Sequence, residues 1–344
     1  MQIGLYALRR LLLLVPQLLL ISIVTFILIR MLPGDPARLQ LGPLAPKAGV
    51  EELRRQLKLD QPIPIQYIAY LERLIHGDFG HSWVNQSNVS SDLALRVPAT
   101  LELIGYGLLV VLLVHIPLAI ITAARGGGIV TRLLKRLTFG YGLLAGALPD
   151  FWLGLLLIFI FFVRLHWTPG PEGRLGVAVT PPTHITGFYT IDALLTGNFN
   201  AFRSAAAHLV LPVVTLSFVY GAPIYKMARS TMTAALRSDY TTYAEGLGLP
   251  RWRVLWYAWR NASPPVVVMF GVISGYLLGG AVLIETVFDL NGIGQYAVQA
   301  ITTSDYAPIQ AFVLVAAVFT VLVYLVVDLI HYGIDPRVRR TRKA

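Results

Sequence analysis

The sequence predicts an all-α polytopic membrane protein. Of its 344 residues, 56% are hydrophobic and only 13% are charged, whereas soluble domains contain about 25% charged residues. The apolar residues come in blocks of roughly twenty, the length that an α-helix needs to cross a bilayer. The net charge of +10 is carried by segments between these blocks. It therefore indicates membrane topology and not nucleic-acid binding.

The first apolar block covers residues 11–29 and directly follows two arginines. It is longer than the apolar region of a typical signal peptide, and no Ala-x-Ala-like site follows it, so we expect an uncleaved transmembrane helix. Residues 32–98 are polar and contain proline, glycine and charges of both signs. Apolar residues recur at helical spacing in segments 51–57 and 67–75, which predicts short helices outside the bilayer.

Five further apolar blocks predict the remaining transmembrane helices. They cover residues 100–123, 137–163, 208–225, 265–288 and 309–330. Residues 164–207 are rich in proline, glycine and threonine, which predicts a loop with one short helix. We therefore expect a first part, residues 1–98, with one span and a long loop, and a core of five spans, residues 99–344.

Basic residues gather on one side of these six spans, the side that holds both termini. They are Arg9, Arg10, Arg125, Arg132, Lys135, Arg136, Lys226, Arg229, Arg237, Arg251, Arg253, Arg260, Arg337, Arg339, Arg340, Arg342 and Lys343. Short loops rich in lysine and arginine stay in the cytoplasm, while long translocated loops carry little of this signal. Both termini are therefore predicted to be cytoplasmic.

Motifs for nucleotide or metal chemistry are missing from the sequence. Gly126-Gly127-Gly128 lacks the Lys-Ser/Thr of a phosphate loop, and Gly246-Leu247-Gly248 lacks the third glycine of a dinucleotide fingerprint. There is no His-Glu-x-x-His, no Gly-x-Ser-x-Gly and no cysteine. We therefore predict no catalytic, cofactor-binding or metal-binding residues and no ATP hydrolysis by this chain.

Residues 239–261, between the fourth and fifth spans, read as two short helices joined by a turn. Ser238 or Asp239 can cap the first helix with a side-chain oxygen. Gly248 stands where a helix must end with a positive φ, and Pro250 suits the first turn of the next helix. Two interpretations remain open. The helices form either an amphipathic pair at the lipid headgroups or a rigid docking element for a cytoplasmic partner.

The same segment carries the pattern Asp-Tyr…Ala-x-x-x-Gly-Leu…Arg-Asn-Ala, at Asp239, Tyr240, Ala244, Gly248, Leu249, Arg260, Asn261 and Ala262. This pattern resembles the cytoplasmic loop of permeases in binding-protein-dependent ATP-binding-cassette importers, and most closely the dipeptide/oligopeptide/nickel branch. The resemblance extends over nearly the whole chain. It includes Leu32-Pro33-Gly34-Asp35-Pro36-Ala37, Gly77 to Ser82, Gly279 to Phe288, Val327-Asp328-Leu329 and Asp335-Pro336-Arg337.

The resemblance implies a type I importer permease fold in the bacterial inner membrane, with this chain as the first permease subunit. The implied partners are a second permease, two ATPases that bind ATP and magnesium, an extracytoplasmic solute-binding protein and membrane lipid, but no nucleic acid. The implied cargo is a dipeptide or oligopeptide, with a nickel chelate or glutathione as alternatives. A channel or receptor that works without ATPases is the alternative from another class.

The resemblance also implies that the coupling loop 238–262 docks in a groove of an ATPase. Its expected docking residues are Asp239, Tyr240, Ala244, Gly248, Leu249, Arg253 and Asn261. Thr242, Glu245 and Leu247 stand where the family usually has basic residues, which bears on the ATPase that is accepted.

Two acidic residues in the spans are candidates for the translocation pathway, because a carboxylate inside a bilayer usually faces protein or water. Glu285 lies near the outer end of the fifth span, where it suits a free peptide amine; the alternative is a local capping role. Asp150 follows Pro149, which breaks the helical hydrogen-bond ladder. Its alternative is a role in the kink itself.

Overall fold

The computed structural model describes residues 2–31, 36–42, 44–56, 58–124 and 128–334. The predicted motif at residues 32–35, the glycines 126 and 127 and the basic tail after Ile334 lie outside these residues. Within the described residues, five helical segments are long and apolar enough to cross a membrane. They are α1 (Gln2–Met31), the run Val89–Ala123, α10 (Phe199–Leu236), α12 (Arg251–Phe288) and α14 (Tyr306–Ile334). An all-α membrane fold is confirmed.

The run Val89–Ala123 is one continuous helical rod. It consists of α5 (Val89–Val110), a π-helical turn η1 (Val111–His115) and α6 (Ile116–Ala123). The rod packs along α10 and α12. It covers the predicted span 100–123 and begins eleven residues earlier than the start of that span.

The third predicted span is not one straight helix. It consists of α7 (Ile129–Ala147), α8 (Asp150–Leu157) and the π-helical η2 (Ile158–Arg164), with a bend of 113° between the two halves. The break falls at Leu148-Pro149, where both residues are extended, with ψ of 129° and 140°. A residue before proline is pushed out of the helical region and proline cannot donate to the ladder, so the chain turns here.

The helices on either side of the predicted docking segment are longer than expected. Each of α10 and α12 has 38 residues, so the predicted separate helix after Pro250 is the first part of α12. The prolines at 264 and 265 lie inside α12 and do not end it. Small and apolar side chains such as Ala258 and Ala262 bury this part of α12 against α10, and such packing, more than propensity, stabilises protein helices.

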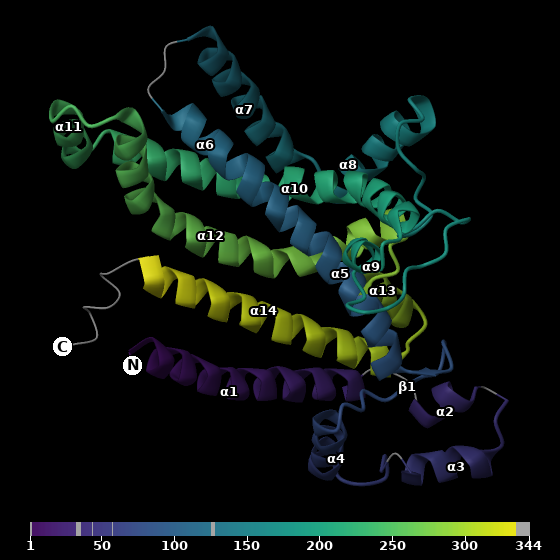
Figure 1. Cartoon of the computed structure of the whole chain (residues 1–344). Helices are drawn as coiled ribbons and strands as arrows, with labels where there is room; N and C mark the ends of the chain where they lie inside the picture. The colour runs from purple at the N-terminus through teal and green to yellow at the C-terminus, as the bar shows by residue number, and fades with distance from the viewer. Residues whose placement is uncertain (1, 32–35, 43, 57, 125–127, 335–344) are drawn as a thin grey trace.

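The two long helices form the centre of the bundle, with α14 packed on α12 and α1 packed on α14 (Figure 1). The start of α1, the end of α14 and the short helix α11 (Asp239–Gly246) lie at one end, which we name the terminal end (Figure 1). An ion pair of 3.0 Å between Arg10 and Asp328 joins α1 to α14 near that end. The start of α1 and the end of α14 at one end of the bundle agree with the predicted topology; that this side is cytoplasmic stays a prediction.

The opposite end, which we name the loop end, carries the connecting segments (Figure 1). It holds α2 (Pro36–Leu41), α3 (Lys47–Gln56), α4 (Ile63–Ile75), the antiparallel hairpin of β1 (His81–Ser82) and β2 (Ser87–Asn88), α9 (Tyr189–Leu195) and α13 (Ile293–Thr302). The predicted short helices at 51–57 and 67–75 correspond to parts of α3 and α4, and the one expected in 164–207 is α9. The hairpin was not expected from the sequence.

Candidate coupling segment and transport face

The short helix α11 is fixed to the end of α10 by hydroxyl groups. The Oγ1 of Thr241 donates to the carbonyl of Ala235 at 2.6 Å, and the Oγ of Ser238 donates to the same carbonyl at 2.6 Å. Ser238 occupies the N-cap position of α11, but its side chain makes no hydrogen bond to the free N–H groups. The predicted side-chain cap at Ser238 is therefore wrong, because the hydroxyl binds the preceding helix.

The turn after α11 depends on Gly248, as predicted. This residue has φ of +72°, and its N–H donates to the carbonyl of Glu245 at 3.0 Å, while the N–H of Leu249 donates to Ala244 at 3.3 Å. A Cβ at Gly248 would meet no heavy atom within 4 Å. A larger side chain here would cost roughly 1–2 kcal/mol of backbone strain, and its Cβ would stand in open space.

Large apolar side chains stand exposed at the tip that α11 forms with the start of α12. Tyr243, Leu247 and Trp252 are 70%, 61% and 65% exposed. A cluster of exposed apolar side chains marks an interaction site, and aromatic residues dominate the energetics of such sites. We name these three residues the exposed tip. Leu247 was noted in the sequence only as a departure from the family pattern.

The residues expected to dock are spread over both sides of this segment. Asp239 and Tyr240 are exposed in the first turn of α11, whereas Ala244 faces its own chain and is only 8% exposed. Arg253 lies over the ring of Trp252 at 5.3 Å, and Asn261 donates to the carbonyl of Tyr257 at 3.1 Å. Gly248 is exposed and Leu249 half-buried. Their docking role stays a prediction.

Close packing joins α10 and α12 directly below the tip. Met232, Ala235 and Leu236 of α10 form a buried cluster with Ala258 and Ala262 of α12. Because packed interiors transmit displacement with little compression, a push on α11 would move both long helices together. The segment is therefore attached to two long helices that are packed against each other.

Glu285 lies inside the subunit at the end of α12. It is 1% exposed, its Oε1 accepts a hydrogen bond from Thr100, and its Oε2 accepts from the N–H of Gln295 at 3.0 Å. A Cβ at Gly292 would stand 2.4 Å from the carboxylate carbon. The carboxylate thus closes the N-terminus of α13 onto α5, which is the capping alternative that the sequence left open.

Glu285→Gln separates this capping role from a role in the pathway. Because the amide keeps the shape but weakens the charged hydrogen bonds, we expect a loss of roughly 1–2 kcal/mol in stability with unchanged uptake by folded complexes. Thermal unfolding of the purified complex and uptake per folded complex would measure this. A pathway residue would give the reverse result, with lost uptake at an unchanged unfolding midpoint.

Asp150 stands at the bend between α7 and α8 and lines an open cavity of about 510 Å³. Its Oδ1 accepts from the N–H of Phe151 at 2.7 Å and its Oδ2 from the hydroxyl of Tyr220 at 3.0 Å. A Cβ at Gly280 would stand 1.8 Å from that hydroxyl, so glycine is needed for Tyr220 to reach Asp150. The carboxylate of Asp150 therefore binds the backbone at the bend and also faces the cavity.

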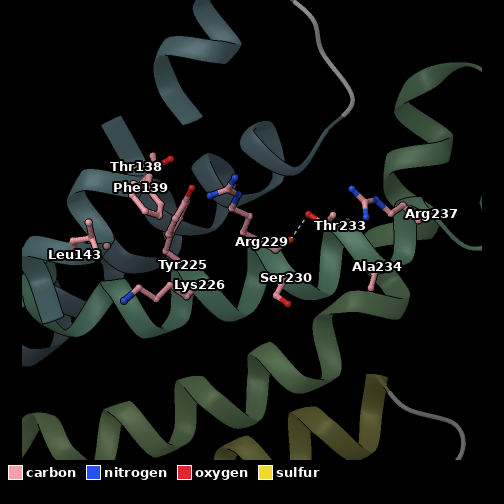
Figure 2. A pocket seen from close by; sticks show the side chains of 11 residues that line it. Thr138, Phe139, Leu143, Tyr225, Lys226, Arg229, Ser230, Thr233, Ala234 and Arg237 are labelled. Atoms are coloured by element: carbon pink, nitrogen blue, oxygen red, sulfur yellow. Dashed lines mark hydrogen bonds between the residues drawn. The ribbon is translucent and has the colours of Figure 1, made fainter. Parts of the chain in front are cut away.

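A second cavity of about 500 Å³ lies between α7 and α10, nearer the terminal end (Figure 2). Its lining includes Lys226, Arg229 and Arg237, and Lys226 also lines the cavity of Asp150. The sequence analysis assigned these cations to topology alone. A signal was present, because polar residues at 226, 230, 233 and 237 recur at helical spacing on α10.

The loops at the loop end are tied down by buried carboxylates. Burial opposes ionisation of Asp192, but hydrogen bonds from Thr186, Ile185 and Gly187 outweigh it and hold its pKa below the ordinary value. Burial raises the pKa of Asp305, which accepts a hydrogen bond of 2.6 Å from Ser82. Asp192 therefore stabilises its loop at neutral pH, and this contribution is lost as the pH falls through its lowered pKa.

The buried ion pair between Arg174 and Glu102 was also not predicted from the sequence. The Nη2 of Arg174 lies 2.6 Å from the Oε2 of Glu102 and 2.9 Å from the carbonyl of Gly187. The other oxygen of Glu102 accepts from the N–H and hydroxyl of Thr190 at 2.9 and 2.5 Å. The pair docks the long loop after η2 and the start of α9 onto α5.

Two family models together match most of the chain. The model described as the inner membrane component of binding-protein-dependent transport systems covers residues 115–340, and the N-terminal model of such membrane components covers residues 5–104. Their boundary, between residues 104 and 115, falls inside the helical rod Val89–Ala123.

Curated relatives match along nearly their full length. The probable D,D-dipeptide transport system permease protein DdpB of Escherichia coli is 43% identical over 93% of this chain and 93% of its own length. The di/tripeptide permease protein DppB of Pseudomonas aeruginosa is 38% identical over 97% and 98%. The glutathione permease protein GsiC of Salmonella paratyphi A is 33% identical over 97% and 98%. With the fold described above, these matches show that the chain belongs to the family of inner-membrane permease components of binding-protein-dependent transport systems.

Proposed function

We propose that this chain is one permease subunit of an ATP-driven importer of short peptides. The family supplies the general class, a membrane component that works with a binding protein and ATPases. Several relatives are named as dipeptide or di/tripeptide permeases, which supports a peptide cargo. In this proposal the chain forms half of the pathway, a second permease forms the other half, and each permease contacts one ATPase.

Coupling would run through the exposed tip. ATP binding draws the two ATPases together, each ATPase pushes on a tip in the cytoplasm, and the attached helices α10 and α12 tilt. To reverse a 1:99 preference between two states, the partners must favour one state by about 5.5 kcal/mol. Nucleotide binding on the ATPases is the source of that energy in this scheme. The observation that carries the proposal is an exposed apolar tip fixed rigidly between two helices of 38 residues.

Reconstitution of defined subunits into vesicles tests this proposal. Vesicles with both permeases, both ATPases and the binding protein should accumulate radiolabelled dialanine only when ATP is present on the tip side. Vesicles with this chain alone should accumulate none. ATP-independent accumulation by the chain alone would instead support a channel, and competition by glutathione or a nickel chelate but not by dipeptides would change the cargo.

A further inference from the structure

The two cavities on the α7–α10 face are joined at Lys226, which lines both of them. The cavity nearer the terminal end is cationic, because Arg229 and Arg237 also line it and none of the described acidic residues does. Hydroxyls of Ser230 and Thr233 add hydrogen-bonding groups (Figure 2). Among the described residues, none of the three cationic side chains forms an ion pair or a hydrogen bond. This cavity therefore has the chemistry of an anion site.

The side chain of Lys226 does not extend toward the nearer membrane interface, as lysines in membrane helices usually do. A Cβ added at Gly142 would lie 2.9 Å from its Cε and 3.8 Å from its Nζ, and one added at Gly146 would lie 3.9 Å from its Nζ, so the side chain lies against α7 between these two glycines. Figure 2 shows its ammonium directed away from Arg237 and the terminal end. Lysines that escape a bilayer extend toward the nearer interface, which for Lys226 is the terminal end of α10. The ammonium instead lies between Gly142, which lines the cationic cavity, and Gly146, which lines the cavity of Asp150.

The cavity of Asp150, which Lys226 also lines, offers the opposite charge. Asp150 uses each carboxylate oxygen once within the chain, and a carboxylate has about four acceptor positions, so it can accept further donors. Its partner Tyr220 stands six positions before Lys226 on α10, roughly 9 Å of helical rise. Two extended residues span roughly 7 Å. An extended dipeptide with two charged ends is therefore comparable in length to this rise.

We propose that this face binds the two charged termini of a short peptide during its passage. Asp150 accepts hydrogen bonds from the α-ammonium group, while Lys226, supported by Arg229, binds the α-carboxylate. The inference rests on the proposed importer function and adds that the permease itself selects zwitterionic cargo. Asp150, which the sequence indicated as a pathway candidate, is thereby assigned to the α-ammonium group of the peptide.

Uptake by the complete complex of three radiolabelled alanine peptide pools tests this inference. Each pool mixes L- and D-forms of the di- and tripeptide; one is free, one C-terminally amidated and one N-acetylated. Lys226→Met should slow uptake of the free and acetylated pools by roughly tenfold to a hundredfold, the loss expected for one charged hydrogen bond. Its uptake of the amidated pool should equal that of the wild type. Lys226→Arg should restore the free pool.

Asp150→Asn should give the complementary pattern, with slower uptake of the free and amidated pools and unchanged uptake of the acetylated pool. Lys135→Met, which removes a cation of α7 outside both cavities, is the matched control and should behave as the wild type. ATP hydrolysis stimulated by the binding protein should persist in all variants. Each variant is compared with the wild type on the same pool, so preferences of the unaltered binding protein cancel.

Equal slowing of all three pools by Lys226→Met would overturn the inference. If that slowing also followed the anionic lipid content of the vesicles, the cavity would hold a lipid phosphate instead. In both cases ATP-driven uptake by the wild type would leave the importer function standing. If the wild type transported none of the pools, the peptide cargo and this inference would both fall.

Discussion

Gly248→Trp is expected to abolish ATP-driven uptake while the chain remains folded in the membrane. The Cβ of the new side chain has room within the subunit, because a Cβ at Gly248 meets no heavy atom within 4 Å. The positive φ of +72° adds roughly 1–2 kcal/mol of strain, which a protein of this size can absorb. Because Gly248 is exposed and directly follows Leu247 of the exposed tip, a bulky indole there is expected to obstruct the surface that we propose docks an ATPase. Loss of a central contact weakens association by about 2–4 kcal/mol, or roughly 30- to 1,000-fold.

The measurements are uptake into vesicles and co-purification of the ATPases with the variant. Gly197→Trp is the matched control, since Gly197 has φ of +68° and equally open surroundings but lies at the loop end. It should transport normally. Normal uptake by Gly248→Trp would contradict coupling through the exposed tip. So would labelling of a Tyr243→Cys variant from outside the cell, and the chain has no other cysteine to confuse that readout.

The membrane helices and the two-helix segment 239–261 were predictable from the sequence because their signals are local. An apolar block of about twenty residues specifies a span wherever it packs, and a glycine followed by Leu249 and Pro250 specifies a helix end at Gly248. The break before Asp150 was visible as a proline, but its 113° angle was not. That angle depends on how α8 packs against α10 and α12.

The polar contacts of the candidate site could not be predicted, because they join residues far apart in the chain. Tyr220 meets Asp150 across 70 positions, and Glu285 meets Thr100 across 185. A single sequence shows that such residues are polar and lie in apolar blocks, yet it does not identify their partners. Lys226 shows the same limit: its charge fits the topology rule, while its direction along α7 becomes visible only in three dimensions.

Arg174→Ala is expected to destabilise the protein strongly, because it breaks a buried ion pair. The side chains of Arg174 and Glu102 are only 9% and 1% exposed, so the substitution leaves a buried carboxylate without its cation. Breaking such a pair from one side costs about 3–5 kcal/mol. The ring of Tyr189 also loses the guanidinium that lies 3.6 Å from its centroid. Thermal unfolding of the purified protein and proteolysis of the loop before α9 would record this.

The double variant Glu102→Gln with Arg174→Met distinguishes a lost charge balance from lost volume. Glutamine retains an oxygen for the N–H and hydroxyl of Thr190, and methionine fills much of the space of the arginine stem. Replacing both members of a buried pair with neutral groups is often neutral or stabilising, so the double variant should recover most of the stability. Arg203→Ala, at an exposed arginine of α10, should change nothing. A double variant as unstable as Arg174→Ala would mean that packing, and not an unpaired carboxylate, causes the loss.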